Sequence, residues 1–591
     1  MLKAENLVPK QRFWAASSVV VFLIIILIGR FFSLQIYQHE NFSRKAESNR
    51  IRSVTLPAPS GLILDRNKKI LVDNYPTYIL YGIPSEISDK QKNFNIISQA
   101  TGINSDILNK NFEKNYRGRF IPIILAKDLT IEQLSCLEEA KNQLQGIVYK
   151  QFPERFFSNT IRASHALGYL KEIDRETLKS LGKKSPFKYG DLVGGSGLER
   201  EYDNLLQGEK GIEFYEVDAF GREARKITEG KARIPHPGRD LHTTLDMDMQ
   251  RILEQEFRGL RGAGIVSNPK TGGILAYLSS PDYPPDLFTG LIEEQQWASI
   301  IGDAGRPLLN RGSNGTYPPG SIFKMIVMAA ILDQDLVKYT WETTCRGYYE
   351  FGDRVFKCWN EFGHGAVNLE KALVESCDVY FYRVIQKFSI NKIAEYSRIF
   401  GLGRATDIDL PSEMTGRVPD RSYMNRRYGR SGWAMGNLLN ISIGQGELLV
   451  TPIQMVVYIN YLATRGNTPK LHFIDLPSDS YEKYPPVYLS NNIWSFLENS
   501  MRKVVSSENG TGRAADPDIP DLVIAGKTST AENPHGEPHA WFIAYAKKGD
   551  DMISLVLLVE NGGHGGETSA PIANKIFAEY FRDESITMTD K

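Results

Sequence analysis

The segment TYPPGSIFKMIVMAAIL, residues 316–332, decides how we interpret this chain. Its Pro-Pro-Gly triplet cannot continue a helix, whereas the apolar residues after it predict one, so Ser321 is expected in the first helical turn. Free backbone N–H groups and the helix dipole favour developing negative charge there. Residues i and i+3 share a helix face, which places Lys324 beside Ser321. A lysine held out of water loses its proton more readily, and this predicts that Lys324 activates the Ser321 hydroxyl as a nucleophile.

The S-x-x-K pattern by itself is weak, and context must separate Ser321 from the other matches. Only Ser321 combines a glycine hinge, a helix start and apolar backing. Ser500, for example, lies inside the predicted helix NIWSFLENSMRKVV, where no glycine turn exposes its hydroxyl. Taken without any further motif, Ser321 fits equally well a helix N-cap with a surface lysine. The remaining matches are at Ser180, Ser185, Ser267, Ser389 and Ser480.

The composition is that of a globular protein with room for two or three domains. The chain has 591 residues, of which 42% are hydrophobic and 24% are charged. Its formal net charge is +0, so the overall balance gives no reason to expect a nucleic-acid partner. Its 4 cysteines are too few for a disulfide framework in a chain of this length.

A single membrane span is predicted near the N-terminus. Residues 13–29, FWAASSVVVFLIIILIG, carry no charge, and continuing through residue 37 gives a stretch long enough to cross a hydrocarbon core of about 30 Å. Lys3, Lys10 and Arg12 precede it and no A-x-A cleavage site follows. We therefore expect a cytoplasmic tail at 1–12, an inner-membrane span at 13–37 and a periplasmic remainder. The alternative is a cleaved signal peptide.

Two regions follow the predicted span. Residues 38–241 alternate short β-rich pieces with polar helical pieces and predict an irregular α/β spacer domain. In residues 242–591 the segments are longer. There, 262–280 and 540–561 each predict a β-hairpin, and an amphipathic helix, SAPIANKIFAEYF, follows the second. Strands from both ends of a domain with helices between them indicate an antiparallel sheet with helices packed on it, which is an α+β fold.

Two further motifs occur where a Ser–Lys acyl-transfer enzyme needs them. Ser376-Cys377-Asp378 lies in the predicted helical region ALVESCDVYFYRV, and Lys527-Thr528-Ser529 closes the predicted strand DLVIAG. Together with Ser321 and Lys324, they resemble the motifs S-x-x-K, S-x-N/D and K-T/S-G of penicillin-binding proteins and serine β-lactamases. The order of the three motifs along the chain matches as well.

The resemblance covers nearly the whole chain and is to the penicillin-binding protein 2 family, the elongation-specific class B transpeptidases of the bacterial cell wall. NRGSNGTYPPGSIFK, GHGAVNLEKALVESCDVYFYRV, SIGQGELLVTPIQ, GKTSTAE and VENGGHGG resemble stretches of that family's catalytic domain. Residues 57–74 and 190–211 resemble its membrane-proximal pedestal, also called the dimerisation domain. The resemblance implies a pedestal at 38–241 and a transpeptidase domain with a serine β-lactamase-like fold at 242–591.

This resemblance also implies a D,D-transpeptidase mechanism. Ser321 would attack the carbonyl of the penultimate D-alanine in a D-Ala-D-Ala stem peptide, and β-lactams would acylate the same serine. Lys324 would act as the general base, and Ser376 would relay the proton to the leaving amine. Asp378 occupies the third place of the second motif. The amine of a neighbouring stem peptide would then take the acyl group, which gives the cross-link.

Substrate binding is implied for the third motif. Lys527 and Thr528 would hold the terminal carboxylate of the substrate, one as a charge and the other as a hydroxyl donor. The backbone N–H groups of Ser321 and Thr530 would form the oxyanion hole. Ser529 stands where the family usually has glycine, and its side chain is expected to share a strand face with Lys527 and to project toward the cleft. That departure leaves the affinity for β-lactams open.

The family implies membrane partners and no cofactor for catalysis. The partners would be a SEDS-type glycosyltransferase and other proteins of the elongation complex, some of them touching the pedestal. Ser60 replaces the arginine that is usual in the pedestal motif, which affects only local contacts. Two alternatives remain: a penicillin-binding sensor or non-catalytic scaffold, and a D,D-carboxypeptidase or β-lactamase that passes the acyl group to water.

A structural zinc ion is expected beside the second motif, held by Cys345, Cys358, His364 and Cys377. Three thiolates and an imidazole suit tetrahedral Zn²⁺, and the spacing C-x12-C-x5-H-x12-C lets one loop fold back over the second motif. The resemblance supports this site, since some members of the family carry zinc with the matching histidine and cysteine as ligands. The alternatives are a Cys345–Cys358 disulfide and unpaired thiols.

Overall fold

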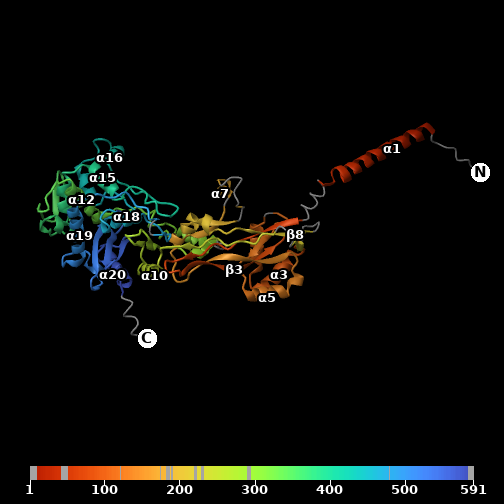
Figure 1. Cartoon of the computed structure of the whole chain (residues 1–591), viewed down its shortest axis with the longest axis horizontal. Helices are drawn as coiled ribbons and strands as arrows, with labels where there is room; N and C mark the ends of the chain where they lie inside the picture. The colour runs from red at the N-terminus through yellow and green to blue at the C-terminus, as the bar shows by residue number, and fades with distance from the viewer. Residues whose placement is uncertain are drawn as a thin grey trace, which may run out of the picture. The chain divides into compact units, whose positions relative to one another are not determined.

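In the computed structural model, the chain forms two compact units (Figure 1). Unit 1 consists of Met1–Pro59, Pro76–Pro153 and Gly208–Pro237, and unit 2 of Ser60–Tyr75, Glu154–Gln207 and Gly238–Lys591. Unit 2 takes in segments from before residue 242, so the boundary predicted after residue 241 stays a prediction. The structure describes residues 10–40, 51–116, 118–119, 121–173, 175–180, 187, 191–217, 223–227, 232–288, 294–477 and 480–582.

The predicted membrane span forms helix α1 (Lys10–Phe32), which continues into a π-helical turn at Ser33–Tyr37. Within the stretch Gln11–Tyr37, the most apolar window of 18 residues has a mean hydropathy of 2.5, and none of that window is buried. At about 1.5 Å of rise per residue the stretch is long enough to cross a bilayer. In the part of the chain that the structure describes, this is the one helix with these properties, which confirms the expected single apolar N-terminal helix.

Beyond α1, unit 1 combines strands with the helices α3, α4 and α5, as expected for an irregular α/β region. Strand β8 pairs antiparallel with both β1 and β9, and β4 pairs with the last residues of β3. The helices bury a small core around Phe94, Ile97 and Leu125. The strands are β1 (Ile51–Leu56), β3 (Ile70–Gly82), β4 (Ile123–Ala126), β8 (Gly211–Val217) and β9 (Glu223–Ile227), and the helices are α3 (Lys90–Thr101), α4 (Ser105–Lys114) and α5 (Ile131–Glu139).

The segments of unit 2 that precede residue 242 are short and closely packed. Arg155 Nε lies 2.6 Å from Glu199 Oε1, and both side chains are buried, so this pair joins two distant segments inside the unit. Burial raises the pKa of Glu199, and the charge of Arg155 opposes that rise. The elements are β2 (Ile63–Leu64), β5 (Ile147–Phe157), α6 (Ser164–Leu167), β6 (Tyr169–Glu172), α7 (Arg175–Ser180), β7 (Leu192–Ser196), α8 (Gly197–Glu201), α9 (Asp203–Leu206) and β10 (Leu241–His242).

A five-stranded antiparallel sheet forms the centre of unit 2, in the order β12-β11-β19-β18-β17. Both predicted hairpins are confirmed, because β11 pairs with β12 and β18 pairs with β19. The sheet therefore joins strands from the two ends of the predicted domain, as expected for the α+β fold. The strands are β11 (Gly262–Ser267), β12 (Ile274–Ser280), β17 (Val523–Ala531), β18 (His539–Lys548) and β19 (Asp551–Val559).

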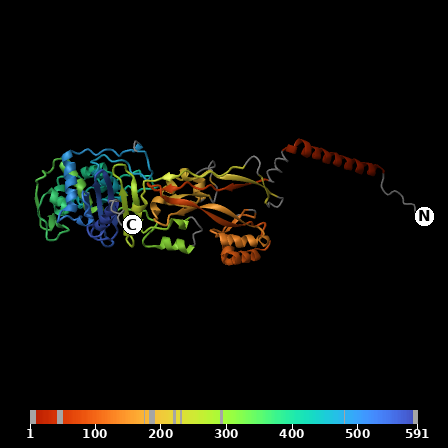
Figure 2. The ribbon, with the colours of Figure 1, turned by 60° about the horizontal axis from the view of Figure 1, so that its bottom comes forward.

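Helices cover both faces of this sheet because its side chains are apolar on both sides (Figure 2). Val266, Phe542 and Leu557 belong to the core under α10 (Met247–Glu256) and α20 (Ser569–Tyr580). Their neighbours Ile543 and Val556 point to the opposite core, on which α18 (Pro452–Ala463) packs. Alternating positions along one strand thus serve two cores, which follows from the two-residue period of a strand.

Helix α12 (Lys324–Asp333) lies inside the larger core, and its buried side chains include every residue from Lys324 to Ile331. It packs against α14, α15 and α19, which surround it. A helix that is apolar on all sides must be surrounded by other elements, and its packing against these three helices fixes the position of its N-terminal end. The other helices are α11 (Glu294–Gly302), α13 (Leu369–Val374), α14 (Asp378–Ile385), α15 (Ile390–Ile399), α16 (Arg421–Tyr428), α17 (Met435–Ser442) and α19 (Asn491–Ser506).

Candidate active site

The predicted nucleophile lies on a tight turn that leads into α12. Gly320 has a φ of 56°, in the left-handed region that favours glycine, and its N–H donates to Gly444 O at 2.9 Å. Ser321 is half-buried in a 3-10 turn at Gly320–Phe323, and the α-helix begins at Lys324. The helical segment thus begins with a 3-10 turn that carries Ser321 and continues directly as α12, which agrees with the expected place of Ser321 in the first helical turn.

Lys324 is fully buried and makes three polar contacts, all to the second motif. Its Nζ donates to Asp378 Oδ1 at 2.6 Å, to Ser376 O at 2.8 Å and to Ser376 Oγ at 3.3 Å. The ammonium group also lies 5.4 Å from the centre of the Phe381 ring. The structure thus brings Lys324 of the first motif into contact with Ser376 and Asp378 of the second motif, which lie 52 and 54 residues further along the chain.

Ser376 does not lie in a helix, which corrects the prediction for this stretch. Helix α13 ends at Val374 and α14 begins at Asp378, and Ser376 has a φ of 58° in the turn between them. A serine in the left-handed region is strained, and such strain is concentrated at functional sites. The turn aims the Ser376 hydroxyl at two lysines, because Lys527 Nζ donates to it at 3.1 Å.

The ionisable groups of this site are buried, and burial dominates their pKa values. Burial lowers the pKa of Lys527 well below its usual value, and the positive charge of Lys324 lowers it further. Burial raises the pKa of Asp378, while the charge of Lys324 and its hydrogen bond oppose that rise. Because burial disfavours the charged form of Lys527, a bound carboxylate would stabilise that form and offset the cost of burying the charge.

The third motif lies within β17 instead of closing it, because the strand runs on to Ala531. Thr528 Oγ1 donates to Thr511 Oγ1 at 2.6 Å, and Thr530 Oγ1 lies 3.2 Å from His564 Nδ1. These two threonines share one face of the strand, and Lys527 is on the other. The strand therefore presents a hydroxyl pair on one side and a buried ammonium group on the other.

Ser529 lies on the same strand face as Lys527, as expected, and its hydroxyl is directed at the nucleophile turn. A Cβ atom added to Gly320 would be 2.2 Å from Ser529 Oγ, so the two residues are in close contact. Ser529 is 2% exposed, and within the described residues its Oγ has no hydrogen-bond partner. The hydroxymethyl group thus fills space beside Gly320, directly next to the nucleophile.

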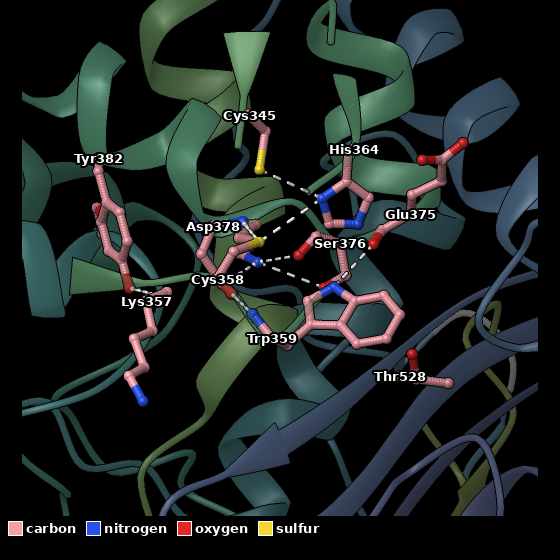
Figure 3. Close-up of polar contacts among 12 residues, drawn as sticks. Cys345, Lys357, Cys358, Trp359, His364, Glu375, Ser376, Asp378, Tyr382 and Thr528 are labelled. Carbon is pink, nitrogen blue, oxygen red and sulfur yellow. Dashed lines mark hydrogen bonds and ion pairs between the residues drawn. The ribbon is translucent and has the colours of Figure 1, made fainter. Parts of the chain in front are cut away.

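The four predicted metal ligands converge beside the second motif (Figure 3). Their ligand atoms lie within 4.8 Å of one another, and all four residues are buried. Cys345 Sγ and Cys358 Sγ each lie 3.6 Å from His364 Nδ1. Cys377 directly precedes α14, which ties the cluster to the turn of the second motif. The alternative Cys345–Cys358 disulfide is absent among the described residues, where every cysteine is a free thiol.

Two residues that the sequence analysis missed support the site. The Trp359 N–H donates to Asp378 Oδ2 at 3.0 Å, and its indole Nε1 donates to Glu375 O at 3.0 Å, so it links the cysteine loop to the second motif (Figure 3). The sequence did contain a signal for Trp359, because this residue directly follows Cys358, one of the predicted metal ligands. Thr511, the partner of Thr528, follows α19 and carries no sequence signal, because only the folded chain brings it to β17.

The comparisons with known proteins agree with this geometry. The profile of the penicillin binding protein transpeptidase domain matches residues 262–578, and that of the penicillin-binding protein dimerisation domain matches residues 55–243. The chain therefore belongs to the penicillin-binding proteins that carry a transpeptidase domain. Within that class, several relatives are named peptidoglycan D,D-transpeptidase MrdA and several structural neighbours are named penicillin-binding protein 2, so the chain is of the penicillin-binding protein 2 type.

The relatives cover nearly the whole chain. The peptidoglycan D,D-transpeptidase MrdA of Haemophilus influenzae is 29% identical over 100% of this chain and 94% of its own length. The Escherichia coli K12 protein of the same name is 28% identical over 95% and 93%. Penicillin-binding protein 2 in a complex with MreC from Helicobacter pylori superimposes with a TM-score of 0.78 at 29% identity, covering 90% of this chain and 99% of that one.

Proposed function

We propose that this chain is a serine-type D,D-transpeptidase that cross-links peptidoglycan stem peptides during cell-wall elongation. The observation that carries this proposal is the Ser376 hydroxyl, which lies 3.3 Å from Lys324 Nζ and 3.1 Å from Lys527 Nζ, next to the turn that bears Ser321. A hydroxyl between two buried amines is suited to pass a proton between the nucleophile side and the leaving-group side of a substrate. The names of the relatives support the same activity.

The proposed reaction proceeds in two acyl transfers. Ser321 Oγ bonds to the carbonyl carbon of the penultimate D-alanine and gives its proton to Lys324. The C–N bond to the terminal D-alanine then breaks, and the proton passes through Ser376 to the leaving amine. The amine of a second stem peptide attacks the ester carbonyl and loses its proton to Lys324, the C–O bond to Ser321 breaks, and Lys324 returns the proton to Ser321 Oγ. The backbone N–H groups of Ser321 and Thr530 stabilise the negative oxygen in both steps.

Lys527 and Thr528 hold the carboxylate of the terminal D-alanine in this proposal. The two side chains lie on opposite faces of β17, but β17 is an edge strand of its sheet, so a charge and a directed hydroxyl donor can both flank a carboxylate that lies along its free edge. β-Lactams carry a carboxylate in an equivalent place and acylate Ser321 through the same contacts. A similar solved structure, that of Pseudomonas aeruginosa penicillin-binding protein 2 in complex with WCK 5153, supports the expectation that a protein of this type binds a small ligand.

Helix α1 anchors the enzyme in the inner membrane, with its N-terminus in the cytoplasm and the catalytic part in the periplasm. The basic residues Lys3, Lys10 and Arg12 before the helix support this orientation. The elongation-complex partners, including a SEDS-type glycosyltransferase and an MreC-like protein, are supported by two solved structures. One contains MreC, and the other is titled as a peptidoglycan synthase complex that coordinates polymerization and crosslinking.

Mass spectrometry of the full-length chain after treatment with a fluorescent penicillin tests the nucleophile. One adduct per chain is expected, and it should map to the peptide that contains Ser321. Ser321→Ala should abolish the adduct. Ser389→Ala is the matched control, because Ser389 belongs to another S-x-x-K pattern, and it should leave the adduct unchanged. An adduct that survives in Ser321→Ala would overturn the assignment.

A zinc ion held by Cys345, Cys358, His364 and Cys377 belongs to the same proposal. Hydrogen bonds from Cys377 and then His364 lower the pKa values of Cys345 and Cys358, which favours their thiolate forms, whereas the same contacts raise the pKa of Cys377, so this thiol would have to give up its proton to a bound zinc ion. His364 Nδ1 faces both sulfurs, so the donor set fits a tetrahedral site. The ion would fix the cysteine loop against the turn of Ser376 and would take no part in the acyl transfers.

Elemental analysis of the purified protein tests the metal site. One zinc per chain is expected for the wild type, and Cys358→Ser should lose it. Cys136→Ser is the matched control, because Cys136 is exposed in α5 and is not a member of the cluster, and it should keep the metal. A wild type without zinc that also shows two fewer titratable thiols after denaturation would instead support the disulfide.

A further inference from the structure

Four arginines form an exposed basic surface on and just after α16. Arg421, Arg426, Arg427 and Arg430 all lie within ten residues, and all four are exposed. The chain as a whole has a formal net charge of +0, so this local excess is not a general property of the protein. We call these four residues the arginine surface.

Neighbouring acids balance the guanidinium groups of the arginine surface only in part. Among the described residues, none of the four forms an ion pair. The two acids nearby already have partners: Asp420 pairs with Arg398 at 2.9 Å and caps α16 by accepting from Tyr423 N. Glu447 lies 3.5 Å from Arg417 and accepts from Tyr423 Oη at 2.8 Å. The charges of these two acids also act on Arg426 and Arg427, and Arg426 donates to a neighbouring serine, so the surface keeps an excess of positive charge and part of its donors for an anion from outside.

Part of the arginine surface is held in place. The Arg421 guanidinium lies 5.8 Å from the Trp433 ring centre, and the indole Nε1 of Trp433 donates to Asn425 Oδ1 at 2.8 Å. Arg426 donates to Ser422 Oγ at 2.6 Å. A hollow of about 450 Å³ opens at the start of the helix, lined by Asn391, Arg398, Asp420, Arg421, Ser422 and Asn425. Ordered guanidinium groups lose less freedom on binding than free ones.

The arginine surface is linked to the nucleophile turn through the next helix. The chain runs from Arg430 into α17, which packs against α14 of the second motif. Beyond α17, Gly444 O accepts the N–H of Gly320, directly before the nucleophile. The surface thus belongs to the same folded unit as the reaction centre, and it takes part in none of the contacts described there.

We infer that the arginine surface binds the carboxylates of uncross-linked peptidoglycan stem peptides and so holds the polymer near the reaction centre. This inference rests on the proposed function. Each uncross-linked D-Ala-D-Ala peptide ends in a carboxylate, so a nascent strand presents repeated negative charges. The planar fork of arginine matches a carboxylate with two parallel hydrogen bonds, and several weak contacts to one polymer add up.

An anionic lipid surface is the less favoured partner. Basic residues that bind lipid headgroups lie close to a membrane span in the sequence, whereas α1 ends at Phe32, almost four hundred residues before Arg421. The nucleophile Ser321, in contrast, is in the same unit as the arginine surface. A polymer that must reach this nucleophile is therefore the partner that the placement supports.

Cosedimentation of the full-length protein with isolated sacculi rich in uncross-linked peptides tests the inference. The variant R426E/R427E/R430E should bind about tenfold more weakly at low salt, because three attractions become repulsions. Wild-type binding should fall as salt rises from about 0.05 M to about 0.3 M, and the variant should lose this dependence. The matched control K338E/R502E/K547E changes the net charge equally at exposed positions elsewhere and should bind like the wild type.

Two further measurements separate the possible outcomes. Sacculi whose carboxylates have been converted to amides should no longer distinguish the variant from the wild type. The fluorescent-penicillin adduct should form normally in the arginine variant, since a small ligand does not need this surface, and a wild type without an adduct would instead refute the proposed function. Equal binding of the two charge variants to sacculi would overturn the inference. So would a loss of binding to phosphatidylglycerol vesicles alone, which would identify the surface as lipid-binding.

Discussion

Two S-x-x-K stretches of this chain share a sequence pattern but differ in the burial of their lysines and in the contacts that these lysines make. Ser389 caps α15, because its side chain accepts from Lys392 N at 3.3 Å. Lys392 is 40% exposed and pairs with Glu395 at 3.0 Å on the same helix. Lys324, in contrast, is fully buried and contacts Ser376 and Asp378 of another motif.

The comparison shows that tertiary surroundings turn this pattern into a catalytic pair. At Ser389 the spacing of three residues produces only a capped helix with a solvated ion pair, which contributes little to stability. At Ser321 a left-handed glycine exposes the hydroxyl, and the lysine is removed from water and placed beside a second serine. Burial and long-range contacts, rather than spacing, separate the two sites.

The largest expected effect is on the two lysines. Lys324→Met should lower the rate of acylation by fluorescent penicillin about 10³-fold, because the proton of Ser321 loses its acceptor. Lys392→Met should change that rate by less than about twofold, since its exposed ion pair lies on a helix surface. Stopped-flow or gel-based acylation rates measure both. Similar losses in the two variants would show that general destabilisation, and not base catalysis, explains the effect.

A second expected effect concerns the Ser376 hydroxyl. Ser376→Ala should slow acylation about 10²-fold, because it removes the group between the two lysines while keeping a Cβ at a φ of 58°. Ser376→Gly removes the hydroxyl and also relieves the backbone strain, so it should be equally slow and slightly more stable. A glycine variant with a normal rate would show that the position matters for backbone shape alone.

A smaller effect is expected for two buried serines without partners. Among the described residues, Ser529 Oγ and Ser500 Oγ are both buried and unpaired. Replacing either by alanine should raise the free energy of unfolding by about 1.5 kcal/mol, because the cost of a buried unsatisfied hydroxyl disappears. Thermal unfolding of the full-length protein in detergent should show both shifts. If Ser500→Ala stabilises and Ser529→Ala destabilises, the Ser529 hydroxyl has a role beside Gly320 that packing does not supply.

The smallest effect is expected at Ser389. Ser389→Ala should lower the free energy of unfolding by about 1 kcal/mol through loss of the N-cap, with the acylation rate unchanged. Ser389→Asp keeps an acceptor for the Lys392 N–H and should restore the stability. Reduced acylation in Ser389→Ala would contradict the separation of the two S-x-x-K sites.

Elements with strong local signals could be predicted from the sequence. The hairpins of β11–β12 and β18–β19, the helix α20 and the apolar helix α1 follow from turn residues and hydrophobic periods, and the structure agrees with them. The turn at Ser376, in a stretch that the sequence predicts as helical, was predicted wrongly. It depends on a left-handed residue, and the energy of such a residue is set by surrounding contacts.

The sequence by itself determined which residues are available for chemistry: a serine and a lysine on one helical turn, a serine and an acid in the second motif, and a lysine on a strand. Only the tertiary structure decided which of them meet. Lys527 reaches Ser376 across 151 residues of chain, and four ligand atoms from a strand end, two loop positions and a helix start converge within 4.8 Å. The physical reason is that burial and hydrogen bonding act between segments that are distant in sequence, and a local pattern contains no information about which distant side chains will exclude water from it.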